Sequence, residues 1–179
     1  GNTTYGFNSN AGNQIYNANV GTGGITNVAL TIFDTGGTDT LDYSGSAAVQ
    51  RIDLNPESFS NVLGQTGNLS IARGTIIENA IGGGGAVIII GNSVANTLSG
   101  GGGGDQLIGG AGDDTLSGNN FAHTLTGGLG NDFFRDTAVR LNRDTITDFG
   151  VGDRIVISNA NIATFTFSLS GTALTYTGG

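Results

Sequence analysis

The chain has 179 residues, enough for one domain of ordinary size, and 34 of them are glycine while only one is proline. Fourteen acidic against six basic residues give a formal net charge of −8, which disfavours binding to nucleic acid. The absence of cysteine and lysine, with only one histidine, excludes disulfides, thiolate zinc sites and lysine nucleophiles. We therefore expect no zinc site and no catalytic residues on this chain. The longest wholly apolar run, 86–90, is far shorter than the roughly 20 residues that span a bilayer, so we expect no membrane insertion.

Short strands are predicted ahead of the middle of the chain. The segments 28–33, 41–43, 49–54 and 69–72 are rich in apolar residues, and several alternate apolar with polar side chains. Turn-forming residues separate them. No convincing helix appears in this region or elsewhere.

A nine-residue repeat begins at Gly82 and runs unbroken to residue 135. Its first position is always glycine, namely Gly82, Gly91, Gly100, Gly109, Gly118 and Gly127. Its eighth position is always large and apolar, namely Ile89, Leu98, Leu107, Leu116, Leu125 and Phe134. Its sixth position holds Val87, Asn96, Asp105, Asp114, His123 and Asp132. Repetition in one register indicates a solenoid built from stacked units.

The units at 100–108, 109–117 and 127–135 fit the pattern G-G-x-G-x-D-x-U-x completely, which identifies it as the calcium-binding RTX nonapeptide of the parallel β-roll. Glycine lets backbone carbonyls turn inward in a tight loop, and aspartate adds an anionic oxygen. The x-U-x triplet is a short strand whose large side chain enters the core. Two units make one coil, so loops on the same edge lie 18 residues apart and stack. Their all-oxygen surroundings suit Ca²⁺.

This stacking ranks the predicted calcium sites. The strongest pairs Asp114 with Asp132, and a weaker one pairs Asn96 with Asp114. A third site contains Asp105 but has Val87 as its partner, so it lacks one carboxylate. The carbonyls predicted to complete these sites belong to Gly83, Gly85, Gly100, Gly102, Gly109, Gly110, Ala111, Gly112, Gly127 and Leu129.

Other interpretations of the repeat are weaker. Asp105 beside His123 could suggest catalysis or a transition metal, but with one histidine a decayed repeat unit explains the pair better. The glycines at 100–104 could suggest a phosphate cradle, but no helix and no lysine follow. A disordered linker would not keep an apolar residue at every ninth position.

Strands are also predicted after the repeat, at 144–149 and 153–158, followed by a hairpin of 164–170 and 173–177 that turns at Gly171-Thr172. The predicted fold is therefore all-β, a parallel β-roll flanked by antiparallel, sandwich-like strands. We expect one continuous domain with three parts. These are an N-terminal strand region at 1–81 with an upstream calcium loop, the roll at 82–135, and a cap with a hairpin at 136–179.

Several flanking segments resemble the C-terminal domain of serralysin-type metalloproteases. They are YGFNSNAG (5–12), IFDTGGTDTLDYSG (32–45), RIDLNPESFSNVLG (51–64), NLSIARGTIIENAIGG (68–83) and DTITDFGVGDRIVIS (144–158). The resemblance implies a further calcium site upstream of the roll, with ligands Asp34, Gly36, Gly37, Asp39, Ile76 and Glu78. Three carboxylates and two glycine carbonyls suit Ca²⁺, whereas the alternative for D-T-G-G-T-D is an ordinary polar turn.

The resemblance also implies a function. It predicts a non-catalytic calcium-binding module of a secreted bacterial zinc metalloprotease, which is extracellular, folds on Ca²⁺ and supports type I secretion. The zinc motif H-E-x-x-H is absent here, so the protease domain would lie in cis or on a separate chain. The alternative is a stand-alone calcium-dependent scaffold for surface assembly or binding.

Overall fold

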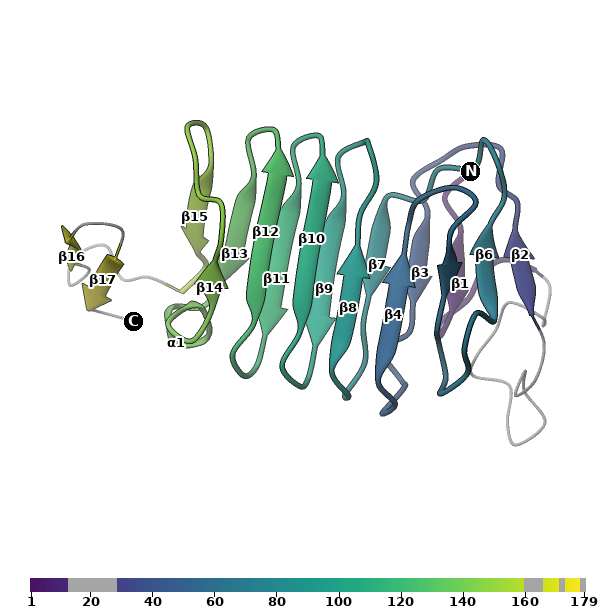
Figure 1. Cartoon of the computed structure of the whole chain (residues 1–179), viewed down its shortest axis with the longest axis horizontal. Helices are drawn as coiled ribbons and strands as arrows, with labels where there is room; N and C mark the ends of the chain where they lie inside the picture. Colours follow the sequence, from purple (N-terminus) through teal and green to yellow (C-terminus); the bar gives the residue numbers. More distant parts are fainter. Residues whose placement is uncertain (13–28, 160–165, 171–172, 178–179) are drawn as a thin grey trace.

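The computed structural model describes residues 1–12, 29–159, 166–170 and 173–177. Strands make up almost all of its regular structure (Figure 1). Ahead of the repeat lie β1 (Thr4–Gly6), β2 (Leu30–Ile32), β3 (Thr40–Asp42), β4 (Gln50–Asp53), β5 (Phe59–Ser60), β6 (Leu69–Ile71) and β7 (Asn79–Ile81). The repeat forms β8 (Val87–Ile90), β9 (Thr97–Gly101), β10 (Gln106–Ala111), β11 (Thr115–Asn119), β12 (Thr124–Leu129) and β13 (Phe133–Asp136). After it come α1 (Ala138–Leu141), β14 (Thr145–Ile146), β15 (Arg154–Ile157), β16 (Thr166–Ser170) and β17 (Ala173–Thr177).

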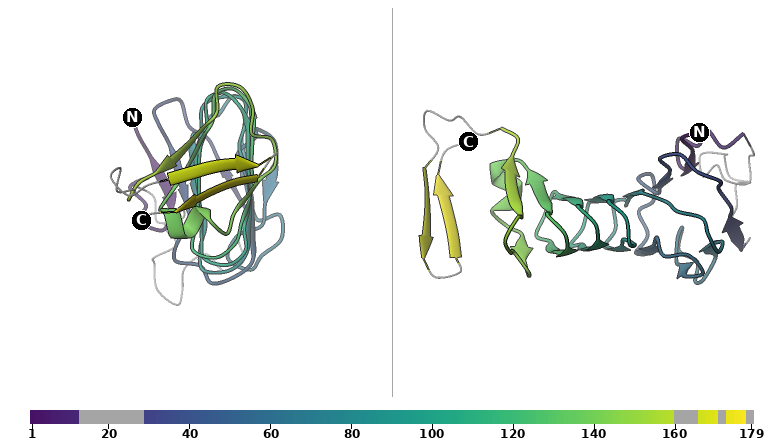
Figure 2. Two further views of the ribbon diagram at one scale, coloured as in Figure 1. Left: turned by 90° about the vertical axis from the view of Figure 1, so that its left-hand side faces the viewer. Right: turned by 90° about the horizontal axis from the view of Figure 1, so that it is seen from above.

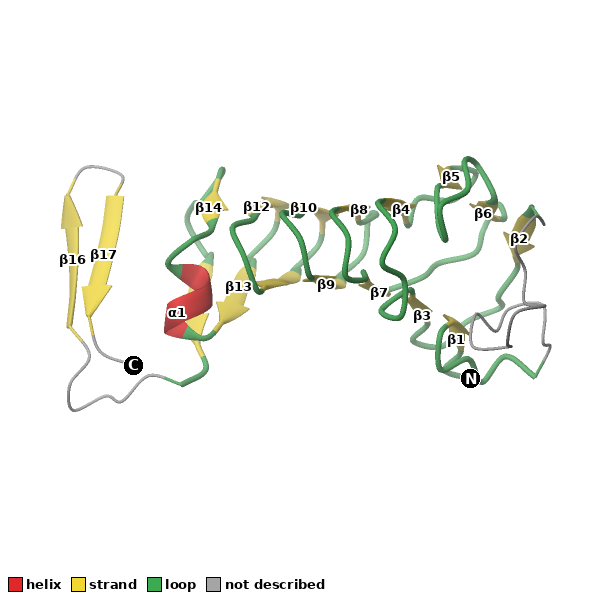
Figure 3. Ribbon diagram, turned by 90° about the horizontal axis from the view of Figure 1, so that it is seen from below, coloured by secondary structure: helices red, strands yellow, loops and turns green. Residues whose placement is uncertain are grey.

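Two parallel sheets face each other along the long axis of the molecule. One has the order β1-β3-β7-β9-β11-β13-β15 and the other the order β14-β12-β10-β8-β4. Seen end-on, their coils overlie one another as a flattened tube, and seen from below the two rows of strands are joined by loops (Figures 2 and 3). Leu107 lies beside Leu125, and Leu116 beside Leu98, each pair 18 residues apart. This register confirms the parallel β-roll predicted from the sequence.

The core of the roll is formed by two columns of eighth-position side chains, one from each sheet. All six are fully buried, from Ile89 to Phe134. Each side chain stacks on its equivalent one coil away, because the parallel register places identical positions next to each other. Each x-U-x triplet therefore lies in a strand whose large apolar side chain enters the core, as the sequence predicts.

We expect Leu116→Ala to destabilise the folded chain by about 2–5 kcal/mol, because Leu116 is fully buried and its truncation leaves a cavity in the core. Val151→Ala is the control, since Val151 is fully exposed and its truncation should change stability by less than about 0.5 kcal/mol. Thermal unfolding of both variants in calcium, followed by circular dichroism, measures the difference. Equal effects would contradict the assignment of this core.

The roll extends beyond the repeat at both ends. In the seven-stranded sheet β1, β3 and β7 continue the parallel pairing upstream, and β15 continues it downstream. The five-stranded sheet is extended in the same way by β4 and β14. Among the described strands, only β5–β6 and β16–β17 pair in antiparallel fashion. The antiparallel strands expected on both flanks are thus confined to these two pairs. The other strands that continue the two sheets beyond the repeat pair in parallel, although the spacing between them is no longer nine residues.

The predicted strands at 41–43, 49–54, 69–72, 144–149 and 153–158 are found, within a few residues, as β3, β4, β6, β14 and β15. The very short β1, β5 and β7 were not predicted, and neither was the single turn of α1. Residue 28, residues 164–165 and the predicted turn at Gly171-Thr172 lie outside the described residues. None of the described helices is long and apolar enough to cross a membrane.

Candidate metal site

The sixth-position side chains form a hydrogen-bonded ladder along each edge of the roll. Each carboxylate accepts a hydrogen bond from the backbone N–H of the sixth position one coil earlier. Asp114 Oδ1 accepts from Asn96 N–H at 2.7 Å, and Asp132 Oδ1 accepts from Asp114 N–H at 2.9 Å. On the opposite edge Asp105 Oδ1 accepts from Val87 N–H at 2.8 Å. The spacing of 18 residues predicted from the sequence therefore brings these groups together.

The second oxygen of each carboxylate has no such partner. Among the described residues, buried Oδ2 atoms without a hydrogen bond belong to Asp39, Asp105, Asp114, Asp132 and Asp144. Leaving a buried charged oxygen unpaired is costly. A column of such oxygens is therefore suited to a cation, and hard anionic oxygens are the ligands that Ca²⁺ takes.

Burial disfavours the ionised form of these carboxyl groups. It raises the pKa of Asp105 and of Asp114 to about 7, and the charge of Asp132 acts in the same direction on Asp114. The pKa of Asp132 is raised by burial and by the nearby charges of Asp153, Asp148 and Asp113. A bound cation would favour the ionised forms that burial disfavours.

The glycine loops shape the space around these oxygens. At the first position the sixth-position side chain lies directly on the glycine: a Cβ on Gly109 would overlap Asp114 Oδ2 and the carbonyl oxygen of Gly127. At the second position Gly110 has a φ of 114°, which side-chain-bearing residues rarely adopt. The repeat therefore requires glycine for close approach at one position and for backbone conformation at the next.

We expect Gly109→Ala to destabilise the folded chain by at least about 2 kcal/mol, because the added methyl group has no free space. Gly104→Ala is the control. A Cβ there would meet only the Ala122 carbonyl oxygen, at 3.4 Å, and should be neutral or slightly stabilising. Chemical denaturation of the two variants in calcium tests this difference. A tolerated Gly109→Ala would mean that Asp114 does not lie over this glycine.

The loops predicted to supply carbonyl ligands stack directly on each other. Gly110, Gly112, Gly127 and Leu129, the carbonyls proposed with Asp114 and Asp132, lie on the loops 109–113 and 127–131. The Leu129 carbonyl accepts a hydrogen bond from Gly112 N–H at 2.8 Å, as the Gly83 carbonyl does from Gly102 N–H. On the other edge, Gly83 and Gly85 belong to the loop 82–86, which stacks on the loop 100–104 that contains Gly100 and Gly102. The remaining predicted ligands, Gly109 and Ala111, belong to the 109–113 loop.

His123 occupies the place that aspartate takes in complete units. It is 3% exposed, its Nδ1 accepts a hydrogen bond from Asp105 N–H at 3.1 Å, and its pKa is lowered by burial. The imidazole Nδ1 thus accepts the backbone hydrogen bond that an aspartate Oδ1 accepts in the complete units. Its loop also keeps the glycine-like backbone, because Asn119 and Phe121 have φ values of 74° and 85°. This geometry is that of a substituted repeat unit.

The upstream ligands are only partly brought together. Asp39 and Glu78 belong to the same ladder, because Glu78 accepts a hydrogen bond from Asp39 N–H at 2.7 Å. Asp34 instead accepts hydrogen bonds from the Tyr5 hydroxyl at 2.6 Å and from Gly36 N–H at 2.9 Å. Gly36 and Gly37 have positive φ values, and Ile76 is partly exposed. In the part of the chain that the structure describes, no three aspartate, glutamate, histidine or cysteine side chains form a metal cluster. Any metal site must then depend largely on carbonyls.

Two members of the ladders were missed in the sequence. Asp144 Oδ1 accepts from His123 N–H at 3.0 Å, and Asp153 Oδ1 accepts from Asp132 N–H at 2.9 Å. Both lie 21 residues after their partners, instead of 18, so a strict nine-residue search does not find them. The usable signal was the aspartate two residues before an apolar strand residue, in Asp144-Thr145-Ile146 and Asp153-Arg154-Ile155.

Comparison with known proteins agrees with this geometry. Metallopeptidase AprA of Pseudomonas marginalis is 50% identical over 82 residues, which are 46% of this chain and 17% of the relative. Serralysin B of Dickeya chrysanthemi is 51% identical over 82 residues, 46% of this chain and 16% of the relative. Serralysin of Photorhabdus luminescens is 52% identical over 80 residues, which are 45% of this chain and 16% of the relative. The alignments thus span about one sixth of these relatives. Because residues 1–176 match the family described as Peptidase M10 serralysin C terminal, the chain belongs to that family.

Proposed function

We propose that this chain is a non-catalytic calcium-binding module of a secreted bacterial zinc metalloprotease, and that it folds when calcium binds outside the cell. The observation that carries the proposal is the set of buried carboxylate oxygens without hydrogen-bond partners, at Asp114 and Asp132 on one edge of the roll and at Asp105 on the other. Ca²⁺ held there would supply the positive charge that the described residues do not. Carbonyls of the stacked glycine loops would complete its coordination.

The same groups make folding depend on the calcium concentration. Without a cation the stacked carboxylates repel one another, and the glycine loops have a large conformational entropy to lose. Calcium binding to the folded state alone adds a stability of RT ln(1 + [Ca²⁺]/Kd). Extracellular modules have Kd values of about 10⁻⁴–10⁻³ M, so their sites fill outside the cell and stay empty in the cytosol.

The family membership supports the wider role. The relatives are peptidases about six times longer than the aligned part of this chain, so we infer a protease domain, in cis or on a separate chain. A chain that stays unfolded until it meets external calcium suits passage through a type I secretion channel. In this role the module supports the protease and contributes no catalytic residue.

A calcium titration tests the proposal. The chain is freed of metal with a chelator, and far-UV circular dichroism is followed as CaCl₂ is added. We expect a cooperative gain of β signal at sub-millimolar to millimolar calcium, and none with MgCl₂ because Mg²⁺ demands a tighter octahedral site. A chain that is fully folded in chelator and indifferent to calcium would overturn the proposal.

A further inference from the structure

One loop of the roll carries two buried polar side chains and yet, unlike the loops with aspartate or histidine at the sixth position, has no buried side-chain atom without a hydrogen bond. The loop at 91–96 contains Asn92 and Asn96, which are 6% and 2% exposed. Asn92 Nδ2 donates to the carbonyl oxygens of Ile77 at 2.8 Å and Leu54 at 3.3 Å. Asn96 Nδ2 donates to the Glu78 carbonyl oxygen at 3.0 Å and to Asn92 Oδ1 at 3.2 Å. Both protons of each amide are therefore used.

The amide oxygens are satisfied as well. Asn96 Oδ1 accepts from Asn92 N–H at 2.8 Å, and Asn92 Oδ1 accepts from Val94 N–H at 3.1 Å. By contrast, Asp105, Asp114 and Asp132 each keep a buried oxygen that has no hydrogen bond among the described residues, although Asp105 Oδ2 lies 3.3 Å from His123 Nδ1. The loop at 91–96 is thus complete without an added charge, whereas the loops after it are not.

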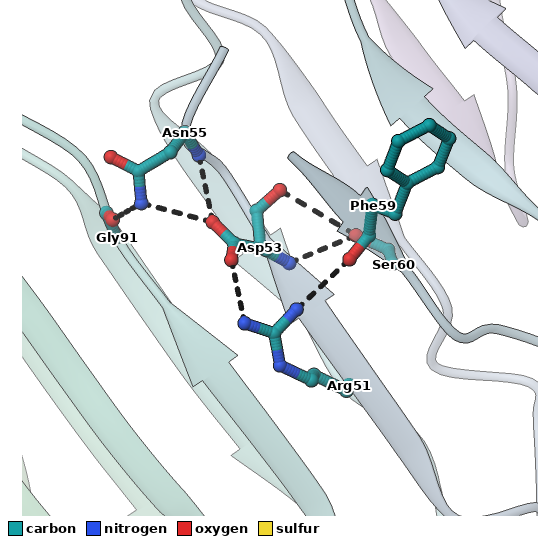
Figure 4. A network of polar contacts seen from close by, with 6 residues as sticks. All are labelled: Arg51, Asp53, Asn55, Phe59, Ser60 and Gly91. Atoms are coloured by element: carbon teal, nitrogen blue, oxygen red, sulfur yellow. Dashed lines mark hydrogen bonds and ion pairs between the residues drawn. The ribbon is translucent and has the colours of Figure 1, made fainter. Parts of the chain in front are cut away.

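A third asparagine joins this loop to β4. Asn55 Nδ2 donates to the Gly91 carbonyl oxygen at 2.8 Å and to Asp53 Oδ1 at 2.9 Å, as Figure 4 shows. The other oxygen of Asp53 pairs with Arg51 at 2.8 Å, so its charge is compensated. We call Asn55, Asn92 and Asn96 the asparagine clasp. Its amide protons bind four backbone carbonyls, those of Leu54, Ile77, Glu78 and Gly91.

We propose that the asparagine clasp takes the place of a bound cation, so that the coil formed by β4, β7, β8 and β9 folds without calcium. The carbonyls of Leu54, Ile77, Glu78 and Gly91 accept amide protons here, so they need no cation. The coil then offers preformed strand edges on β8 and β9, on which β10 and β11 pair when calcium arrives. The inference rests on the proposed function, because it assumes that the chain folds on calcium. Within that chain, the coil of β4, β7, β8 and β9 would fold without metal, and the coils after it would need calcium.

Hydrogen exchange of the whole chain, followed by mass spectrometry with and without calcium, tests the proposal. Without calcium we expect amides in 77–97 to exchange about 100-fold more slowly than those in 105–135, and calcium to remove most of this difference. If both segments exchange fast without calcium and slowly with it, the inference fails while the proposed function stands. If both are equally protected without calcium, the inference and the proposed function fail together.

A variant tests the clasp itself. Asn92→Asp keeps the shape of the side chain but removes the two protons that bind Leu54 and Ile77. We expect it to abolish the protection of 77–97 in chelator, and calcium to restore that protection at least in part. Asn142→Asp makes the same chemical change at an exposed position after α1 and should leave the exchange of 77–97 unchanged. Full protection of Asn92→Asp in chelator would overturn the proposal.

Discussion

Replacing Asp114 with asparagine should change stability in opposite directions in the presence and absence of calcium. Asparagine can keep the hydrogen bond that Asp114 Oδ1 accepts from Asn96 N–H. It removes the buried negative charge, however, and turns the unpaired Oδ2 position into a donor. In calcium we expect at least about a tenfold loss of affinity at this site, equivalent to about 1.4 kcal/mol. In chelator the loss of a buried unpaired charge should stabilise the fold, by about 1–3 kcal/mol.

The measurement in calcium is urea unfolding of the Asp114→Asn chain. In chelator it is the far-UV circular dichroism signal, where a more stable variant shows a larger folded fraction than the natural sequence. Glu57→Gln is the matched control, because it makes the same change of carboxylate to amide on an exposed residue, whose ion pair with the exposed Arg73 contributes little to stability. We expect this control to change stability little in either condition. Destabilisation of Asp114→Asn by the same amount in both conditions would show that Asp114 acts only as a structural hydrogen-bond acceptor.

Without calcium, the chain should become more stable as the pH falls from 8 to 5. The pKa values of Asp105 and Asp114 are about 7 in the folded chain, against about 3.9 for an unfolded aspartate. Between these values the folded state binds protons that the unfolded state does not, so the free energy of unfolding falls as the pH rises through this range. The stabilisation is full below about pH 4 and is lost as the pH passes about 7.

Calcium should reverse this dependence. A bound cation holds the carboxylates ionised, and acid then releases the ion by competing with it. The far-UV β signal of the dialysed, metal-free chain should therefore fall as the pH rises from 5 to 8, whereas the melting temperature measured in millimolar calcium should rise over the same range. Parallel curves in the two conditions would mean that the ladder carboxyl groups are not the calcium ligands.

The repeat made the core and the strongest candidate site predictable. A nine-residue period with an apolar eighth position fixes which side chains stack in the core, and Leu116 and Phe134 lie where it places them. The same period puts Asp114 and Asp132 on one edge, 18 residues apart. These features need no knowledge of distant parts of the chain, because each coil repeats the last.

Other features depend on contacts that no local pattern specifies. Asp144 and Asp153 lie beyond a three-residue insertion that shifts the period, close to the single turn of α1. The asparagine clasp needs the carbonyl of Leu54, which is 38 residues before Asn92. From the repeat motif alone, an asparagine at the sixth position predicts a weaker calcium ligand than aspartate. Only the geometry shows that Asn96 donates both of its amide protons to protein acceptors.

Counting bound calcium ions tests the central claim most directly. Equilibrium dialysis of the metal-free chain against calcium would give the number of ions bound per chain, for the natural sequence and for an Asp114→Asn, Asp132→Asn double variant. We predict at least one ion bound with sub-millimolar to millimolar affinity, and the loss of at least one ion in the double variant. No bound ion in the natural chain, or the same number in both chains, would contradict the claim that this carboxylate column holds calcium.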